Sequence, residues 1–402
     1  MSANQPDSIM LNEVSWKFIR KHRSDNVGKL ALQADRFQIP ELDFKMALQQ
    51  IEGKQLIEHK IPDWFNRDDL LYPQRLSVEQ ASSQITALYK SSLLNGQTLV
   101  DLTGGWGVDH AFMAPSFKQS IYVEKNKALT EIAIHNFHVL GLTKTQVVSG
   151  DGVEYLREMP EADWIYLDPA RRSKDGRKVV SIAHCEPDIS TIQDHLLEKA
   201  DNILIKYSPM LDIAQALKIL RNVAEIHVVS VENECKELLF VLQGEEKEPL
   251  IHCLNFHKKG DQNSCFSLTE EKSCEVVYTS ELGQYLYEPN ASILKAGFFK
   301  SITQHFRVKK LHRDSHLYTS DELVPDFPGR IFRINSSFSF NKKELKAGLD
   351  SIDKANLSTR NFPLKTDELR KKLNLKDGGD IYLFATTLGT KHILIQGESA
   401  ES

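Results

Sequence analysis

The chain has 402 residues, of which 41% are hydrophobic and 26% charged, and its formal net charge at pH 7 is −5. These values are typical of soluble globular proteins and argue against a disordered or membrane-embedded chain. The length favours two or three domains. The net charge gives no global sign of nucleic-acid binding, so such a role must rest on local basic segments.

The N-terminal residues MSANQPDS lack the basic and apolar regions of a secretory signal. The five cysteines are scattered without a C-x-x-C pair, and the histidines show no metal-ligand spacing. The sequence therefore predicts neither a disulfide framework nor a metal site. We expect a cytoplasmic protein without membrane association, and the oligomeric state stays open.

Residues 11–71 are expected to be mostly helical, because apolar residues recur at helical spacing in KLALQADRF and LDFKMALQQIEG. A further helix is predicted in LSVEQASSQITALYKSSLL, where Ser77 and Gln80 fit a capping box. The chain thus begins with a helical region.

Between residues 98 and 243, short apolar strands alternate with amphipathic helices. The expected strands are TLVDL, SIYVE, TQVVSG, WIYLD, NILIKY, EIHVVSV and ELLFVLQ. Helices between the first five strands predict parallel crossovers. The connection ENECK is too short for a crossover helix, so the last two strands should form an antiparallel hairpin. The predicted fold class is α/β with a mostly parallel, Rossmann-like sheet, followed by an α+β region.

The strongest motif is VDLTGGWGVDH, in which a strand runs into a glycine-rich turn. Gly104, Gly105 and Gly107 can let backbone amides approach a ligand at the carboxyl edge of the sheet. A dinucleotide fingerprint counted from Gly105 would need glycine where His110 stands, so nicotinamide binding is disfavoured. Asp101 is instead suited to hold an amino group by a charge-assisted hydrogen bond. The alternative is a simple tight turn.

Two further acids follow the next strands. Glu124 ends the second strand, where a carboxylate can chelate ribose hydroxyls. Asp151 follows the third strand and can accept from an adenine amine or cap the next helix. Chance placement of acids at the ends of three successive strands is less probable than at any one of them.

The fourth strand ends in IYLDPARRSKDGRKV. Asp168 can accept a proton or orient a nucleophilic nitrogen. The basic residues that follow suit a phosphate-bearing substrate, or they form a solvated surface loop. These residues are Arg171, Arg172, Lys174, Arg177 and Lys178.

The fifth strand and the hairpin supply more candidates. Lys206, Ser208 and Pro209 are expected on the same rim of the sheet. Cys235 could serve a covalent step, although a buried cysteine is usually inert. Lys236 is expected to brace the site through hydrogen bonds.

A basic segment lies downstream, in residues 294–313. It has six lysines or arginines and no acid, with Phe298, Phe299 and Phe306 interleaved. Such a segment can bind RNA phosphates and bases, or it is an amphipathic helix whose phenylalanines are core.

The combination of motifs resembles the bacterial class I methyltransferases that carry a C-terminal THUMP-like domain. The matching stretches are EQASSQITALYK, DLTGGWGVDH, YLDPARR, KYSPMLDI, NECKELLF, YLYEPNASILKAG, LYTSDELVPDFPGRIF and RNFPLKTDELRKKL. The usual methyltransferase turn has glycine at the place of Thr103. Ala170 and Arg171 stand where amino-group methyltransferases have an aromatic residue, so the modified atom is not identified.

The resemblance implies S-adenosylmethionine as the cofactor and a particular set of site residues. The expected cofactor-binding residues are Asp101, Thr103, Gly104, Gly105, Gly107, Asp109, Glu124 and Asp151. The expected catalytic residues are Asp168, Pro169, Ala170 and Arg171. The expected substrate-binding residues are Arg172, Lys206, Ser208, Pro209, Cys235 and Lys236.

The expected domains are a helical region (1–75), a class I methyltransferase domain (76–245), a ferredoxin-like subdomain (246–325) and a THUMP-like domain (326–398). The leading functional hypothesis is methylation of RNA, either tRNA or rRNA. The alternatives are a methyltransferase acting on a small molecule or protein, and a non-catalytic module that binds S-adenosylmethionine or RNA. Steep weakening of RNA binding by salt would favour the first, and a closed apolar pocket beside Asp168 the second.

Overall fold

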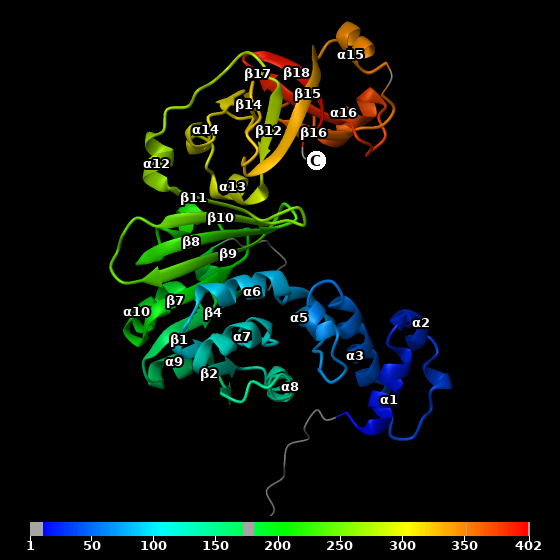
Figure 1. The fold of residues 1–402 in the computed structure, drawn as a ribbon. Coiled ribbons are helices and arrows are strands. Elements are labelled where there is room, and N and C mark those ends of the chain that lie inside the picture. The colour runs from blue at the N-terminus through cyan, green and yellow to red at the C-terminus, as the bar shows by residue number, and fades with distance from the viewer. Residues whose placement is uncertain (1–10, 172–180, 351, 401–402) are drawn as a thin grey trace, which may run out of the picture. The chain divides into compact units, whose positions relative to one another are not determined.

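The computed structural model describes residues 11–171, 181–350 and 352–400 (Figure 1). The chain forms two compact units. Unit 1 comprises Met1–Ala224 and Leu239–Glu246, and unit 2 comprises Glu225–Leu238 and Lys247–Ser402. None of the helices in these described ranges combines the length and apolar character needed to cross a membrane.

Unit 1 contains most of the helices. They are α1 (Glu13–His22), α2 (Val27–Ala31), η1 (Ala34–Arg36), α3 (Phe44–Leu56), α4 (Pro62–Phe65), α5 (Arg75–Gln80), α6 (Gln84–Leu93), α7 (Val108–Met113), η2 (Ala114–Ser116), α8 (Lys127–Val139), α9 (Gly152–Glu158), η3 (Ile182–His184), α10 (Ile189–Lys199) and α11 (Ile213–Ala216). Its strands are β1 (Gly96–Asp101), β2 (Phe117–Glu124), β3 (Thr145–Ser149), β4 (Ala162–Leu167), β5 (Ala170–Arg171), β6 (Cys185–Glu186) and β7 (Ala200–Tyr207).

The unit boundaries fall inside the next two strands, β8 (Val223–Val231) and β9 (Glu234–Gln243). The other strands of unit 2 are β10 (Leu250–Phe256), β11 (Gln262–Ser267), β12 (Tyr285–Pro289), β13 (Lys309–Lys310), β14 (Tyr318–Ser320), β15 (Gly329–Ser339), β16 (Asn356–Arg360), β17 (Tyr382–Leu388) and β18 (Lys391–Ser399). Its helices are α12 (Leu268–Ser273), α13 (Ala291–Ala296), α14 (Ser301–His305), α15 (Lys342–Gly348) and α16 (Thr366–Leu373).

The largest sheet has nine strands in the order β11-β10-β8-β9-β7-β4-β1-β2-β3. The pairs β1–β2, β1–β4, β2–β3 and β4–β7 are parallel, which confirms the predicted mostly parallel sheet. Glu232 and Asn233 join the neighbouring strands β8 and β9, and their φ angles are 49° and 61°. Two successive positive φ angles are typical of a type I′ hairpin turn, so the expected antiparallel hairpin is present. Beyond the boundary expected near residue 245, β10 and β11 extend this sheet.

The helical start of the chain has its own small core, in which Phe18 and Ile19 of α1 pack with Ala47 and Ile51 of α3. The helix predicted from Ser77 is instead two helices, α5 and α6. Ser83, not Ser77, caps α6 by accepting a hydrogen bond from the Thr86 amide at 3.4 Å. The prediction of one helix capped by Ser77 was therefore wrong, because a separate short helix, α5, contains Ser77.

The second sheet lies in unit 2, in the order β13-β14-β12-β15-β18-β17-β16. Its neighbouring strands are antiparallel apart from β16 and β17, which are parallel. The amphipathic helix α16 buries Leu369 against Leu357 of β16 and Leu383 of β17. This is the α+β arrangement predicted for the C-terminal part.

Candidate active site

Four acidic residues lie along one edge of the nine-stranded sheet. Asp101 ends β1 and Glu124 ends β2, while Asp151 follows β3 and Asp168 follows β4. The four strands are neighbours and run parallel. Because the carboxyl ends of parallel strands meet at the same edge, these carboxylates belong to one rim, where ligands of such sheets bind.

Glu124 holds the glycine turn that follows β1. Its Oε2 accepts a hydrogen bond from the Gly105 amide at 2.8 Å, and its Oε1 accepts from the Asn126 amide at 2.7 Å. Gly105 has a φ of 58°, and a Cβ built on it would have the Thr103 carbonyl oxygen, 3.8 Å away, as its nearest neighbour. The turn is therefore open at Gly105, where a ligand can approach the backbone.

Gly104 and Gly107 have a different role, because they face the interior. A Cβ at Gly104 would lie 2.1 Å from the Tyr122 ring, and one at Gly107 would lie 2.8 Å from the Phe137 ring. Core packing therefore accounts for both glycines. Of the three glycines predicted to contact a cofactor, Gly105 is the one with an open side.

Asp101 and Asp151 organise the backbone around them. Asp101 is buried, and its Oδ1 accepts from the Thr103 amide at 3.0 Å. Burial raises the pKa of Asp101, and His110, whose Nδ1 is 3.6 Å from Oδ2, opposes that rise. Asp151 caps α9 by accepting from the Val153 amide at 2.8 Å. The capping role foreseen for Asp151 is thus confirmed.

Thr103 connects the ends of β1 and β4. Its amide donates to Asp101, and its hydroxyl oxygen accepts a hydrogen bond from the Asp168 amide at 2.6 Å. The Thr103 side chain therefore fixes the backbone of Asp168. A hydroxyl is required for this contact, and glycine could not make it.

Asp109 is the centre of a buried polar network that the sequence did not predict. Its Oδ2 accepts hydrogen bonds from the Ser82 hydroxyl at 2.8 Å and from the Tyr166 hydroxyl at 2.7 Å. Lys90 Nζ lies 3.2 Å from Oδ1, and Lys206 Nζ lies 3.4 Å from Oδ2. Burial opposes ionisation of Asp109, but the two lysines outweigh it and hold the pKa of this carboxyl well below its usual range.

Lys206 links this network to the rim. Its Nζ lies 2.6 Å from Asp168 Oδ2, and the Asp168 side chain is 38% exposed against 11% for Lys206. The lysine thus reaches from the interior and fixes a carboxylate that solvent can contact. A fixed, accessible carboxylate is suited to accept a proton or to orient an amine.

The remaining rim residues have simpler surroundings. Pro169 is buried and Ala170 exposed. Ser208 accepts from the Met210 amide at 3.3 Å through its hydroxyl, and Pro209 is half-buried. The backbone of Arg171 pairs with β6. Arg172, Lys174, Arg177 and Lys178 lie outside the described residues.

Cys235 and Lys236 belong to unit 2. Burial raises the pKa of the Cys235 thiol to about 11, although Lys295 lowers it. A thiol with this pKa is a poor nucleophile at neutral pH, so nothing here favours a covalent step. Lys236 pairs with Glu234 at 2.7 Å.

The basic segment of residues 294–313 is not one helix. It comprises the end of α13, all of α14, a turn and β13. Phe298 is buried against Phe266, with ring centroids 4.6 Å apart, and Phe306 packs on Phe327 at 5.6 Å. The phenylalanines therefore serve packing, as the alternative interpretation expected. Four basic residues of the segment are exposed: Lys300, Arg307, Lys309 and Arg313.

Lys310 of the same segment is buried, and its ammonium group donates to the Arg313 carbonyl at 2.6 Å. Burial lowers its pKa to about 8. The unfolded chain therefore binds more protons than the folded one between pH 8 and the ordinary lysine pKa, so stability should rise with pH in this window. We expect the stability of the parent protein relative to Lys310→Met to increase by about 1 kcal/mol per pH unit above pH 8.

Urea unfolding of both proteins at pH 7.5, 8.5 and 9.5 measures this difference. Lys309→Met is the matched control, because Lys309 is the exposed neighbour on the same strand. Equal slopes for Lys310→Met and the parent protein would contradict the expectation.

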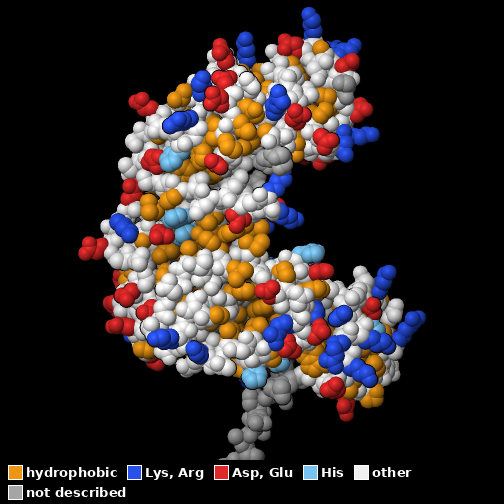
Figure 2. Space-filling model, in the orientation of Figure 1, with side chains coloured by type: hydrophobic (Ala, Val, Ile, Leu, Met, Phe, Trp, Pro, Cys, Tyr) orange, Lys and Arg blue, Asp and Glu red, His pale blue; other side chains and the backbone are white. Residues whose placement is uncertain are grey.

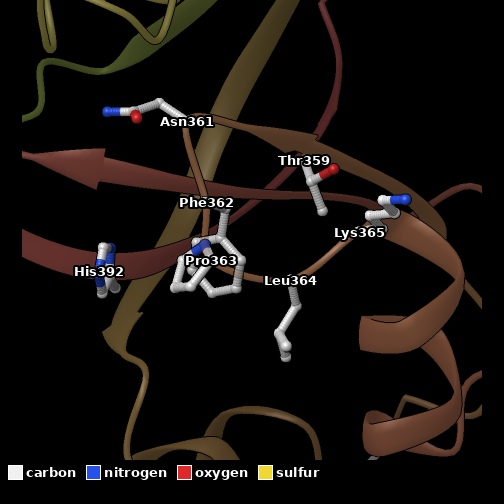
Figure 3. A pocket seen from close by; sticks show the side chains of 7 residues that line it. All are labelled: Thr359, Asn361, Phe362, Pro363, Leu364, Lys365 and His392. Atoms are coloured by element: carbon white, nitrogen blue, oxygen red, sulfur yellow. The ribbon is translucent and has the colours of Figure 1, made fainter.

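A separate open pocket of about 470 Å³ lies in unit 2 (Figure 3). Its lining residues are Thr359, Asn361, Phe362, Pro363, Leu364, Lys365 and His392. The Phe362 and His392 rings meet edge to face with centroids 5.6 Å apart. Asn361 points away from them and donates to His312 Nδ1 at 2.8 Å. The pocket thus combines an aromatic surface with one lysine.

Comparison with known proteins finds a relative that covers nearly the whole chain. The chain is 34% identical to a Porphyromonas gingivalis W83 protein that is assigned as a methyltransferase, with a TM-score of 0.88 over 96% of this chain and 98% of that chain. The chain belongs to the family of that protein. Family models match a ferredoxin-like domain at residues 285–328 and a THUMP domain-like region at 329–399. This family membership confirms the resemblance drawn from the motifs. No curated protein matches the sequence.

Two smaller solved structures are similar to part of this chain. TrmK of M. capricolum, in complex with S-adenosyl-homocysteine, is 13% identical over 40% of this chain and 70% of that chain, with a TM-score of 0.31. An rRNA methylase from Streptococcus thermophilus is 13% identical over 40% and 95% of the two chains, also with a TM-score of 0.31. Likeness at this level carries no argument about ligand or substrate.

Proposed function

We propose that this chain is an S-adenosylmethionine-dependent methyltransferase that acts on RNA in the cytoplasm. The observation that carries the proposal is the Asp168–Lys206 pair beside an open glycine turn, on a Rossmann-like sheet shared with a family assigned as methyltransferases. The cofactor would supply an electrophilic methyl group. The absence of disulfides among the described cysteines agrees with this proposed reducing compartment.

The rim residues fit a cofactor of this kind. The open side of Gly105 can accept close approach of a ligand, and Glu124 stands beside the turn as the acid expected to bind ribose hydroxyls. Asp101 and Asp151 would contribute to cofactor binding partly by fixing the backbone amides of Thr103 and Val153. Asp168 would orient the acceptor atom and accept its proton, while Lys206 positions Asp168 and the Asp109 network positions Lys206.

RNA as substrate draws its support from unit 2. The THUMP-like match covers residues 329–399, and the exposed residues Lys300, Arg307, Lys309 and Arg313 can contact phosphates. The methyltransferase and THUMP-like domains expected at residues 76–245 and 326–398 remain part of this proposal. A tRNA or an rRNA would serve equally on these grounds.

The test is methyl transfer from radiolabelled S-adenosylmethionine to total RNA of a strain that lacks the gene. We expect label in this RNA and none in RNA of the parent strain, whose sites are already methylated. Label found only in the protein or small-molecule fraction would show that the substrate is a protein or a small molecule and not RNA. S-adenosylhomocysteine at 100 times its Kd should stabilise a donor-binding fold by about 2.7 kcal/mol. Absence of both effects would leave a non-catalytic module.

A further inference from the structure

A cluster of two histidines and one glutamate lies in unit 2, apart from the residues of the proposed active site. In the parallel pair β8–β10, His227 and His252 are direct partners in the register. Glu225 lies two residues before His227 on β8, and alternate residues of a strand point to the same face. The three side chains therefore share one face, where Figure 2 shows histidine side chains beside an acidic one over β8 and β10.

The three ligand atoms are close together. Glu225 Oε2 is 3.2 Å from His227 Nε2 and 3.5 Å from His252 Nε2. All three atoms lie within 4.8 Å of one another. Two ligands bound to a tetrahedral zinc ion at about 2.0–2.1 Å are about 3.3 Å apart. Both distances to the carboxylate oxygen are thus near those of a zinc site.

The two imidazole rings present the same nitrogen, Nε2, towards Glu225. The rings stack with centroids 4.6 Å apart and planes 10° apart. Because the nitrogen lone pairs lie in the ring planes, binding of one ion requires the two rings to tilt so that both lone pairs point to it. His227 is buried, whereas the side chains of His252 and Glu225 are 25% and 40% exposed, so an ion can enter from solvent.

We propose that Glu225, His227 and His252 form a zinc site that ties β8 to β10, with water as the fourth ligand. Two imidazoles and one carboxylate form a donor set that zinc accepts readily, whereas magnesium and calcium prefer oxygen ligands. Because the three ligands converge only in the folded sheet, zinc would bind the folded chain and stabilise it.

The test uses the full-length protein without a purification tag, stripped of metal by a chelator. Zinc is titrated against a competing indicator, and bound metal is counted by mass spectrometry. We expect one zinc per chain and a higher melting temperature on zinc addition. His252→Asn and Glu225→Gln should each weaken binding by about 100-fold or more. Cobalt should give the visible absorption of a tetrahedral site.

A control variant separates this site from adventitious binding. His257→Asn removes a histidine that faces a single carboxylate, Glu232, at 3.5 Å, and it should bind zinc like the parent protein. Glu225 is partly exposed, so Glu225→Gln keeps the test valid if a histidine variant fails to fold. Unchanged zinc binding in Glu225→Gln and His252→Asn, or its loss in the control, would overturn the proposal.

Discussion

Lys90→Met is expected to lower the free energy of unfolding by about 3–5 kcal/mol, because it leaves the buried Asp109 carboxylate with one cation fewer. The Lys90 side chain is fully buried, and its ammonium group lies 3.2 Å from Asp109 Oδ1. Lys206 remains 3.4 Å from Asp109 Oδ2, but removing one of two cations from a buried carboxylate costs more than the loss of a surface ion pair. Urea unfolding followed by circular dichroism measures the difference.

The double variant Lys90→Met with Asp109→Asn separates charge from packing. If the under-compensated charge of Asp109 causes the loss, the second substitution should recover at least half of the lost stability. Lys118→Met, at an exposed lysine of β2, is the control and should change stability by less than about 0.5 kcal/mol. A Lys90→Met protein as stable as this control would show that the network contributes little.

Asp168→Asn is expected to lower kcat/KM for methyl transfer by about 10²–10⁴-fold, since an amide cannot accept the acceptor's proton. The substitution keeps the shape of the side chain and the backbone hydrogen bond to Thr103. Binding of S-adenosylhomocysteine should therefore stay within a few-fold of the parent protein. The assay compares initial rates on the RNA substrate with thermal stabilisation by the product.

Asp201→Asn is a matched control for this experiment. Asp201 is exposed near the start of β7, whereas Lys206 lies near the end of the same strand. It should retain the parent rate. A rate for Asp168→Asn within about threefold of the control would exclude Asp168 as the base and leave it at most a positioning role.

Much of the fold could be predicted from the sequence because its signals are local. Apolar strands separated by amphipathic helices identified the parallel sheet, and the short link at Glu232 and Asn233 identified the hairpin. The split between α5 and α6 does not follow from the capping-box pattern, because Ser77 with Gln80 satisfies it, whereas Ser83, the cap observed for α6, is followed three residues later by Thr86. The sequence does not predict the two strands β10 and β11, because polar residues interrupt their apolar pattern.

The site was predicted less completely. The acids at the strand ends follow from topology. Ser82 and Lys90 lie in the stretch EQASSQITALYK and Tyr166 lies in YLDPARR, but the spacing within these stretches does not predict that the three side chains meet at Asp109. The Glu225, His227 and His252 cluster depends on the register of two strands, which spacing along the chain does not reveal.

The hydroxyl of Thr103 has a consequence for how related enzymes can vary. It is the acceptor for the Asp168 amide, so serine can substitute without loss of that bond, whereas valine of nearly equal volume cannot. A relative with glycine at this turn gains backbone freedom but must leave the corresponding amide to water or to a bound ligand. The residue at position 103, after β1, and the residue at position 168, after β4, should therefore change together in evolution.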